Sequence, residues 1–159
     1  LEVAGQLADR LHRPRALARL REDLEASVRE LAARTRSGAS VYVIRFRDGN
    51  HIQVFGPGGL FDGVLRRAGL DNAWDGASNY WGFAMVPIER LDRAADHLVV
   101  IEPVNRQAEA LMGDSRIWQA LPVVREGRVH RLPPIWSFGG VPSAIRFARL
   151  LGASIDERR

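Results

Sequence analysis

Hydrophobic residues in the first quarter of the chain repeat with the period of a helix. Leu17, Leu20 and Leu24 begin a series that continues at positions 28 and 31, while the opposite face carries Arg, Glu and Asp. Spacings of three and four residues are typical of one face of an amphipathic helix. Pro14 suits the first turn, where a backbone N–H would be unpaired. We predict a helix of about 20 residues, roughly 30 Å long, starting near Pro14. A similar pattern at residues 2–12 predicts a shorter helix before it.

The rest of the chain alternates between apolar runs of strand length and helical patterns. We predict strands at residues 41–46, 51–55, 83–86, 98–101, 123–124 and 129–132. We predict helices at residues 59–68, 105–112, 116–121 and 141–151, and one helical turn at 88–91. Asp48-Gly49 predicts a hairpin between the first two strands. The alternation favours an α/β fold with a mixed, mostly parallel sheet flanked by helices. The long helix is then either a surface helix on the sheet or a strut between two lobes.

Composition and charge narrow the class of protein. The chain has 159 residues, 46% of them hydrophobic, which is the size and balance of about one globular domain. It has no cysteine, which excludes disulfides and thiolate metal sites. Leu1 is not a natural first residue, so we expect a mature or shortened form of a longer protein. The 23 basic residues are all Arg, alternate with acidic residues as in RLRED at 19–23, and leave a net charge of only +4. This scatter predicts no nucleic-acid binding.

Side chains capable of catalysis or metal binding are dispersed along the sequence. The histidines have no ligand spacing, and we interpret each as an ordinary surface or edge residue: His12, His51, His97 and His130. Ser137 and Ser143 lie in no nucleophile-elbow pattern. The GPGG sequence at 56–59 precedes a predicted helix and is interpreted as a tight turn rather than a phosphate cradle. We predict no catalytic residue and no metal site.

Two aromatic loops are the unusual feature of this sequence. NYWGF at 79–83 and PIWSFGG at 134–140 place Trp81 and Trp136 among Gly, Ser and Pro. Trp74 and Trp118 are expected in the core, because Trp118 falls in a helical stretch and Trp74 reads similarly. Loops run over the surface, and ligand pockets favour aromatic walls. Trp81 and Trp136 are therefore either core residues or parts of a ligand-binding wall.

Two long segments resemble a known family. They are VFGPGGLFDGVLRRAGLDNAWDGASNYWGFAMVPIERL and IWQALPVVREGRVHRLPPIWSFGGVPSAIRFARLL. Their spaced motifs, from VFGP and NAW to WQALP and the last aromatic loop, resemble the C-terminal lobe of the periplasmic ferric-hydroxamate siderophore-binding proteins of ABC importers. The resemblance covers residues 40–151, and residues 1–38 match more loosely. It implies two α/β lobes joined by one long rigid helix, with the ligand in a shallow cleft between them.

The resemblance implies a division of the chain and a set of ligand contacts. Residues 1–13 would end the N-terminal lobe, 14–37 would form the inter-lobe helix, and 38–159 the C-terminal α/β lobe. Ligand-binding residues would be Tyr80, Trp81, Trp136, Ser137 and Phe138. Related proteins carry Tyr at position 138 and an aromatic at 137, so this sequence leaves siderophores other than hydroxamates open. Iron would be bound only inside the siderophore, and the protein would need no cofactor of its own.

The resemblance also implies partners and a location. The chain would bind a ferric siderophore in the periplasm, or as a lipid-anchored extracytoplasmic protein, and deliver it to an ABC permease. Glu89 matches an acidic residue that docks on the permease, although a solvated carboxylate at a helix start is an equal interpretation. The exposed cleft wall of one lobe predicts self-association. An enzyme and a protein-interaction domain on a similar α/β scaffold are the alternatives.

Overall fold

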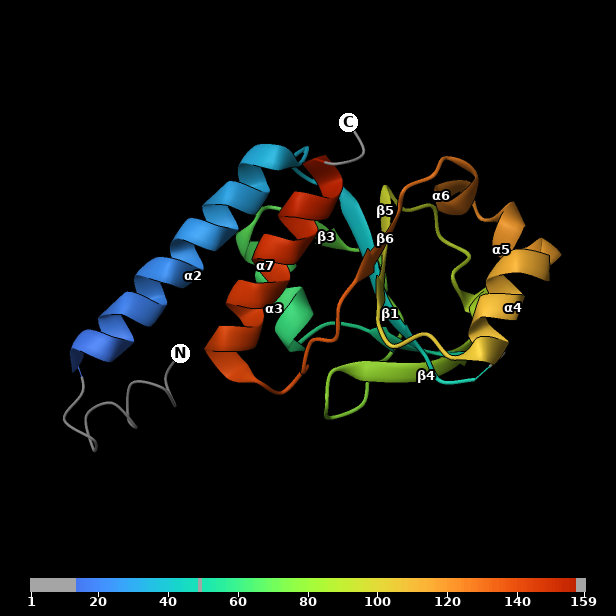
Figure 1. Cartoon of the computed structure of the whole chain (residues 1–159), viewed down its shortest axis with the longest axis horizontal. Coiled ribbons are helices and arrows are strands. Elements are labelled where there is room, and N and C mark those ends of the chain that lie inside the picture. Colours follow the sequence, from blue (N-terminus) through green and yellow to red (C-terminus); the bar gives the residue numbers. More distant parts are fainter. Residues whose placement is uncertain (1–13, 49, 157–159) are drawn as a thin grey trace.

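The computed structural model describes residues 14–48 and 50–156, which form a sheet covered by helices on both faces (Figure 1). The strands are β1 (Ser40–Phe46), β2 (His51–Phe55), β3 (Asp71–Asn72), β4 (Phe83–Pro87), β5 (His97–Ile101) and β6 (Val129–Leu132). The helices are α2 (Pro14–Arg34), α3 (Leu60–Arg67), α4 (Arg106–Asp114), α5 (Arg116–Ala120), α6 (Pro122–Arg125) and α7 (Gly140–Asp156). A 3-10 turn, η1 (Ile88–Arg90), follows β4.

The strand order is β4-β2-β1-β5-β6, with β3 paired to the start of β1. β1, β5 and β6 are parallel, whereas β2 is antiparallel to both β1 and β4. The mixed, mostly parallel sheet and the β1–β2 hairpin are confirmed. Because parallel strands end at the same edge, the segments that leave β1, β5 and β6 emerge together, which is where α/β proteins usually bind ligands.

Two hydrophobic cores lie on opposite faces of the sheet. In β1, Val41 and Val43 face the core beneath α2, α3 and α7, while Tyr42 and Ile44 face the core beneath α4, α5 and α6. Successive strand residues point to opposite faces, so a strand buried on both sides becomes a continuous apolar run. Trp74 and Trp118 are buried in the second core, as predicted.

Helix α2 is held to the domain through its C-terminal half. Leu24, Val28 and Leu31 are buried, and they belong to the same core as residues of α7. Gly152 in α7 lies against Arg34 and the backbone of Leu31, so the absent side chain allows a close approach of the two helices. Among residues 15–23 of α2 no side chain is fully buried, Leu20 packs partly against the core, and this half of the helix extends away from the sheet (Figure 1). Its role as an inter-lobe helix stays a prediction.

Three secondary-structure predictions differ from the structure. Residues 123–124 form part of helix α6, not a strand, because Pro122 starts a helical turn that buries Val123. The last helix runs on to residue 156, through Gly152. The two-residue strand β3 was not predicted because it is too short to show a period. The predicted helix at 2–12, and with it the proposed end of an N-terminal lobe at 1–13, lies outside the described residues.

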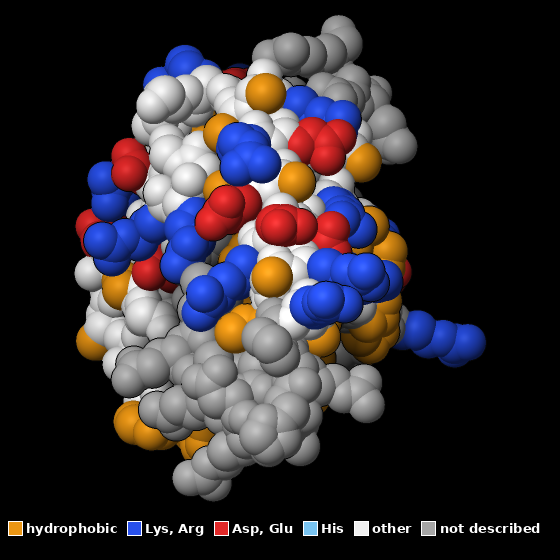
Figure 2. Space-filling view, turned by 90° about the vertical axis from the view of Figure 1, so that its left-hand side faces the viewer, with side chains coloured by type: hydrophobic (Ala, Val, Ile, Leu, Met, Phe, Trp, Pro, Cys, Tyr) orange, Lys and Arg blue, Asp and Glu red, His pale blue; other side chains and the backbone are white. Residues whose placement is uncertain are grey.

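The surface around α2 carries mixed charges (Figure 2). Arg and acidic side chains alternate there, and pairs such as Arg29–Glu25 and Arg34–Glu30 join successive helical turns. The described side chains on this face therefore form no continuous basic patch of the kind that binds a phosphate backbone. Within the described residues, no helix combines the length and apolar character that a bilayer crossing requires.

Candidate functional site

The NYWGF loop is shaped by one asparagine side chain. Oδ1 of Asn79 accepts from the backbone N–H of Trp81 at 2.9 Å and of Phe83 at 3.3 Å. The backbone of Asn79 also bonds to Phe83 and Gly82. Asparagine favours such turns because its side chain can replace a backbone acceptor. These bonds hold the backbone so that the Trp81 ring projects from the start of β4.

Glycine residues allow the NYWGF loop to pack closely against the GPGG turn at 56–59, which follows β2. The N–H of Gly56 donates to the carbonyl of Gly82 at 2.9 Å. Gly82 has a φ of +76°, and a Cβ there would lie 2.7 Å from Cα of Gly59. Both the backbone angle and the close approach require glycine at position 82.

The GPGG turn is stabilised by buried polar groups of its own. Oδ2 of Asp62, in the first turn of α3, accepts from the N–H of Gly58 at 3.1 Å. The side-chain amide of Asn72 donates to Oδ1 of Asp62 at 3.3 Å and to the carbonyl of Phe55 at 3.2 Å. The Gly58 N–H is thus already bonded to the Asp62 carboxylate, whose negative charge would repel a phosphate. This supports the interpretation of GPGG as a tight turn.

The second aromatic loop joins β6 to α7. Ile135 is buried in the core, and the N–H of Gly139 donates to the carbonyl of Trp136 at 3.0 Å. Nη2 of Arg45, on β1, donates to the carbonyl of Ile135 at 2.9 Å. The loop is therefore anchored on both sides of Trp136, and it crosses from β6 toward β1.

The two loops carry four exposed aromatic side chains, and the adjoining strand β4 carries a fifth exposed apolar side chain, Met85; we call these five side chains the aromatic patch. Its members and their exposed fractions are Tyr80 at 93%, Trp81 at 59%, Met85 at 50%, Trp136 at 70% and Phe138 at 49%. The Trp81 ring centroid lies 5.3 Å from that of Tyr80 and 5.5 Å from that of Phe138. Figure 1 shows both loops at the lower edge of the domain.

The structure rules out one of the two interpretations that the sequence left open for Trp81 and Trp136, namely that they are core residues. Neither ring is part of the core, so both are exposed, and their role in ligand binding stays a prediction. Trp81 packs on Phe138, and no ring contact among the described residues joins Trp81 directly to Trp136. Ser137 is half-buried between the exposed Trp136 and Phe138. The rings meet at 82° and 74°, so they form an angular wall.

A row of three side chains across the sheet reaches the patch at Met85 and was not predicted from the sequence. Arg45 on β1 pairs with Gln53 on β2, which pairs with Met85 on β4. The alternation of strand side chains puts this row on the face of Phe55 and Phe83, next to the aromatic loops. Gln53 is buried, Arg45 is half-buried and Met85 is half-exposed. The sequence feature that could have indicated this row is Arg45, a charged residue inside the apolar run VYVIRF.

Glu89 lies away from the aromatic patch. It is exposed in η1, beyond the opposite end of β4 from Trp81. The five residues of β4 place it about 13 Å or more from the aromatic loop, at roughly 3.3 Å per strand residue. Glu89 is thus exposed and separate from the aromatic patch, and its docking role stays a prediction.

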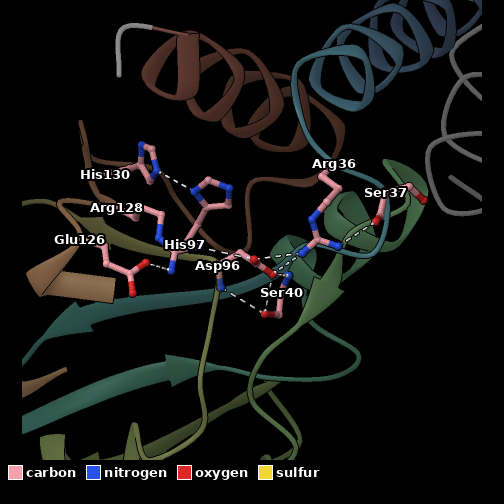
Figure 3. Close-up of polar contacts among 8 residues, drawn as sticks. All are labelled: Arg36, Ser37, Ser40, Asp96, His97, Glu126, Arg128 and His130. Atoms are coloured by element: carbon pink, nitrogen blue, oxygen red, sulfur yellow. Dashed lines mark hydrogen bonds and ion pairs between the residues drawn. The ribbon is translucent and has the colours of Figure 1, made fainter. Parts of the chain in front are cut away.

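Two of the described histidines, His97 and His130, meet at the β5–β6 edge of the sheet (Figure 3). Nδ1 of His97 lies 3.0 Å from Nε2 of His130, whose Nδ1 lies 2.9 Å from Oγ of Ser154. His130 lies on the edge strand β6, as one half of its prediction allows, but at 1% exposure it is not a surface residue, because it packs against His97 of β5 and Ser154 of α7. Burial lowers the pKa of His97, although the Asp96 charge opposes this.

Asp96 links this histidine pair to the end of α2. Its carboxylate accepts from the Ser40 N–H at 2.8 Å and from Nη2 of Arg36 at 2.9 Å (Figure 3). The Ser40 N–H, followed by Arg36, lowers the pKa of Asp96. Arg128 joins the cluster through ion pairs with Asp96 and Glu126. The cluster secures the segment after α2 to the sheet. Within residues 14–48 and 50–156, no group of three His, Asp or Glu side chains is arranged to hold a metal ion.

Comparison of the sequence with known proteins identifies its family and one similar relative. The family model described as periplasmic binding protein matches residues 1–135. The iron(3+)-hydroxamate-binding protein FhuD of Escherichia coli (strain K12) is 40% identical over 110 residues, which are 68% of this chain and 37% of FhuD. The chain therefore spans little more than a third of that relative.

Solved structures agree on the fold. FhuD from Vibrio cholerae, a siderophore-binding protein with bound Fe3+–Desferal, superimposes with a TM-score of 0.80 at 23% identity. The match covers 94% of this chain and 58% of that protein. The triscatecholate siderophore-binding protein FeuA from Bacillus subtilis, in complex with ferri-bacillibactin, gives 0.74 at 19% identity over 92% of this chain and 55% of FeuA. With the family model matching most of its length, the chain belongs to the periplasmic binding protein family.

Proposed function

We propose that this chain is the C-terminal, ligand-binding part of a substrate-binding protein that captures a ferric siderophore for an ABC importer. The observation that carries the proposal is the aromatic patch, because four large aromatic side chains are exposed on two anchored loops, with the exposed Met85 on the adjoining strand β4. The 40% identity to an iron(3+)-hydroxamate-binding protein supports the same ligand class, with hydroxamates as the first candidates. The proposed location is the periplasm, or the outer face of a membrane through a lipid anchor.

The proposed binding mechanism needs no metal ligand from the protein. The oxygen atoms of a siderophore fill the coordination sphere of Fe3+, so the iron is cargo and the protein contacts the organic shell. Trp81 and Trp136 supply large, stiff apolar surfaces that lose little entropy on binding. At about 25 cal/mol per Å2, two indoles that each lose roughly 60 to 80 Å2 contribute about 3 to 4 kcal/mol. Tyr80, Ser137 and Phe138 complete the proposed contact surface.

Delivery to the permease is the second part of the proposal. Glu89 would meet a basic residue of the permease while the patch holds its ligand, because the two lie at opposite ends of β4. A rigid α2 between two lobes would restrict their relative movement. Release would then depend on the permease more than on a wide hinge.

Chelate binding by tryptophan variants tests the proposal. A ferric siderophore should quench the fluorescence of the chain, and equilibrium dialysis should show retention of the coloured chelate. The double variant Trp81→Ala, Trp136→Ala should lose at least about ten-fold in affinity in dialysis. Ile117→Ala, which removes another exposed apolar side chain on α5, is the matched control and should bind like the parent.

Two experimental outcomes would contradict the proposed binding site or the proposed function. Full binding by the double tryptophan variant would place the ligand away from the aromatic patch. Failure of the parent chain to bind any ferric chelate, together with capture of a protein or turnover of a small molecule, would favour the protein-interaction or enzyme alternative.

A further inference from the structure

Met85 is an exposed thioether side chain on the edge strand of the sheet. It lies on β4, at one end of the strand order, and pairs with Gln53 of the antiparallel strand β2. Phe83, two residues earlier on the same face, packs against the core, whereas Met85 is 50% exposed. The covered part of this face therefore ends between these two residues, and the side chain of Met85 is open to solvent.

Met85 also lies between the two aromatic loops. Along β4 it is two residues, about 7 Å, from Phe83, where the NYWGF loop ends. Across the sheet it is two strands, about 10 Å, from Arg45, whose guanidinium donates to the carbonyl of Ile135 in the second loop. A bulky ligand that spans both loops would therefore pass over the Met85 side chain.

The second methionine of the chain gives an internal comparison. Met112 lies in α4, is partly buried and packs against the core that contains Trp118. The sequence has no cysteine and only two methionines, so these two thioethers hold its only sulfur atoms. A soluble oxidant reacts first with the sulfur that it can reach. Hydrogen peroxide should therefore oxidise Met85 before Met112.

The oxidation changes the chemical character of the patch. Hydrogen peroxide transfers one oxygen atom to Sδ: an S–O bond forms, the O–O bond breaks, the thioether is oxidised, and the peroxide is reduced to water, which keeps both hydrogen atoms. The product, methionine sulfoxide, is polar, and dedicated reductases convert it back to methionine. A sulfoxide oxygen covered by an apolar ligand surface loses its hydrogen bonds to water, so covering it is unfavourable.

We infer that Met85 is the oxidation site of the aromatic patch and that its sulfoxide form binds the ligand more weakly. The site itself depends only on the exposure of the thioether. The effect on affinity rests on the proposed function, in which a ferric siderophore covers the patch. Hydrogen peroxide would thus lower siderophore binding, and reduction of the sulfoxide would restore it.

The oxidation rates of the two methionines test the site. After timed exposure to hydrogen peroxide and removal of the peroxide with catalase, trypsin releases Met85 in residues 68–90 and Met112 in residues 107–116. The first peptide also contains two tryptophans, so fragmentation in the mass spectrometer must assign the added oxygen to Met85. Met85 should gain oxygen about ten-fold faster than Met112, and the two rates should become equal in urea. Equal rates in the folded chain would overturn the inference.

Chelate binding before and after oxidation tests the effect. The probe is ferrichrome, a ferric tris-hydroxamate, in equilibrium dialysis. Complete oxidation of Met85 should weaken binding by about three- to ten-fold, and methionine sulfoxide reductases should restore the affinity of the parent. Met85→Leu has no sulfur at this position, so its affinity, whatever the starting value, should be the same before and after peroxide. Met112→Leu is the matched control and should lose affinity on oxidation as the parent does.

Two results would overturn the effect on affinity. One is an unchanged affinity after full conversion of Met85 to the sulfoxide. The other is an equal loss of affinity in peroxide-treated Met85→Leu, which would assign the loss to other residues. In both cases binding of ferrichrome by the unoxidised parent would leave the proposed function standing. If the unoxidised parent bound neither ferrichrome nor ferri-bacillibactin, the proposed function itself would be contradicted.

Discussion

The ring of Trp81 meets the ring of Phe138 edge to face, with centroids 5.5 Å apart and planes at 74°. The edge of an aromatic ring is positive and its face negative, so this arrangement is attractive. The contact joins two loops that are distant in sequence and anchored by different neighbours. The orientation of Trp81 therefore depends on the β6–α7 loop as well as on its own turn.

Loss of Phe138 should weaken ligand binding partly through Trp81. In Phe138→Ala the indole loses a packing partner and gains rotamer freedom, which must be lost again on binding. We expect a three- to ten-fold loss of affinity for a ferric chelate. A double-mutant cycle with Trp81→Ala, measured by dialysis, should give a coupling of about 0.5 to 1.5 kcal/mol. Strict additivity would mean that the two rings act independently.

Gly82→Ala should distort the first aromatic loop. Alanine is strained at a φ of +76°, and its Cβ would lie 2.7 Å from Cα of Gly59. We expect a loss of about 3 kcal/mol or more in the free energy of unfolding, or displacement of the loop with loss of chelate binding. Urea unfolding and dialysis on the same preparation measure the two effects.

Gly58→Ala separates backbone strain from steric contact. Gly58 lies in the neighbouring turn with a φ of +83°, yet a Cβ there would meet no atom within 4 Å. This variant should lose only about 1 kcal/mol in the free energy of unfolding. If the two alanine variants were equally stable and bound equally well, the close approach of Gly82 to Gly59 would not be needed.

The histidine pair should make the domain less stable in mild acid. Burial lowers the pKa of His97, so the unfolded chain takes up a proton near pH 6.5, before the folded chain does. The free energy of unfolding is then highest above about pH 6.5 and falls as pH drops through the folded pKa. Urea unfolding at pH 7.5 and 5.5 should show this decrease.

His97→Gln should reduce the decrease in stability between these two pH values. His51→Gln changes an exposed histidine outside the pair and serves as the control, which should behave like the parent. A pH dependence unchanged in His97→Gln would assign the effect to other groups.

The aromatic patch should promote self-association of this chain. Five exposed apolar side chains in one region gain free energy when a second copy covers them. Light scattering across a concentration series should show a rising average mass, and Trp136→Ser should reduce the rise. A constant monomer mass at high concentration would contradict this prediction.

The order of helices and strands followed from periodicity wherever the elements were long. The stripe at Leu17, Leu20 and Leu24 marked α2, and apolar runs marked β1, β2 and β5. Valines 123 and 124 misled the strand prediction because β-branched residues favour strands, whereas Pro122 and burial of Val123 set a helical turn. An element as short as α6 has too few residues to show a helical period, so the strand preference of its two valines dominated the prediction.

The sequence by itself determined the α/β class, the two core tryptophans and the two loops that carry Trp81 and Trp136, because spacing and turn residues are local properties. Only the tertiary structure decided that Trp81 packs on Phe138, that His130 is buried against His97, and that Arg45 lies under the second loop without a counter-ion. These relationships depend on strand register and on a loop that crosses the sheet. The packing of the whole domain sets both the strand register and the path of this loop. Neither can therefore be predicted from a short stretch of sequence.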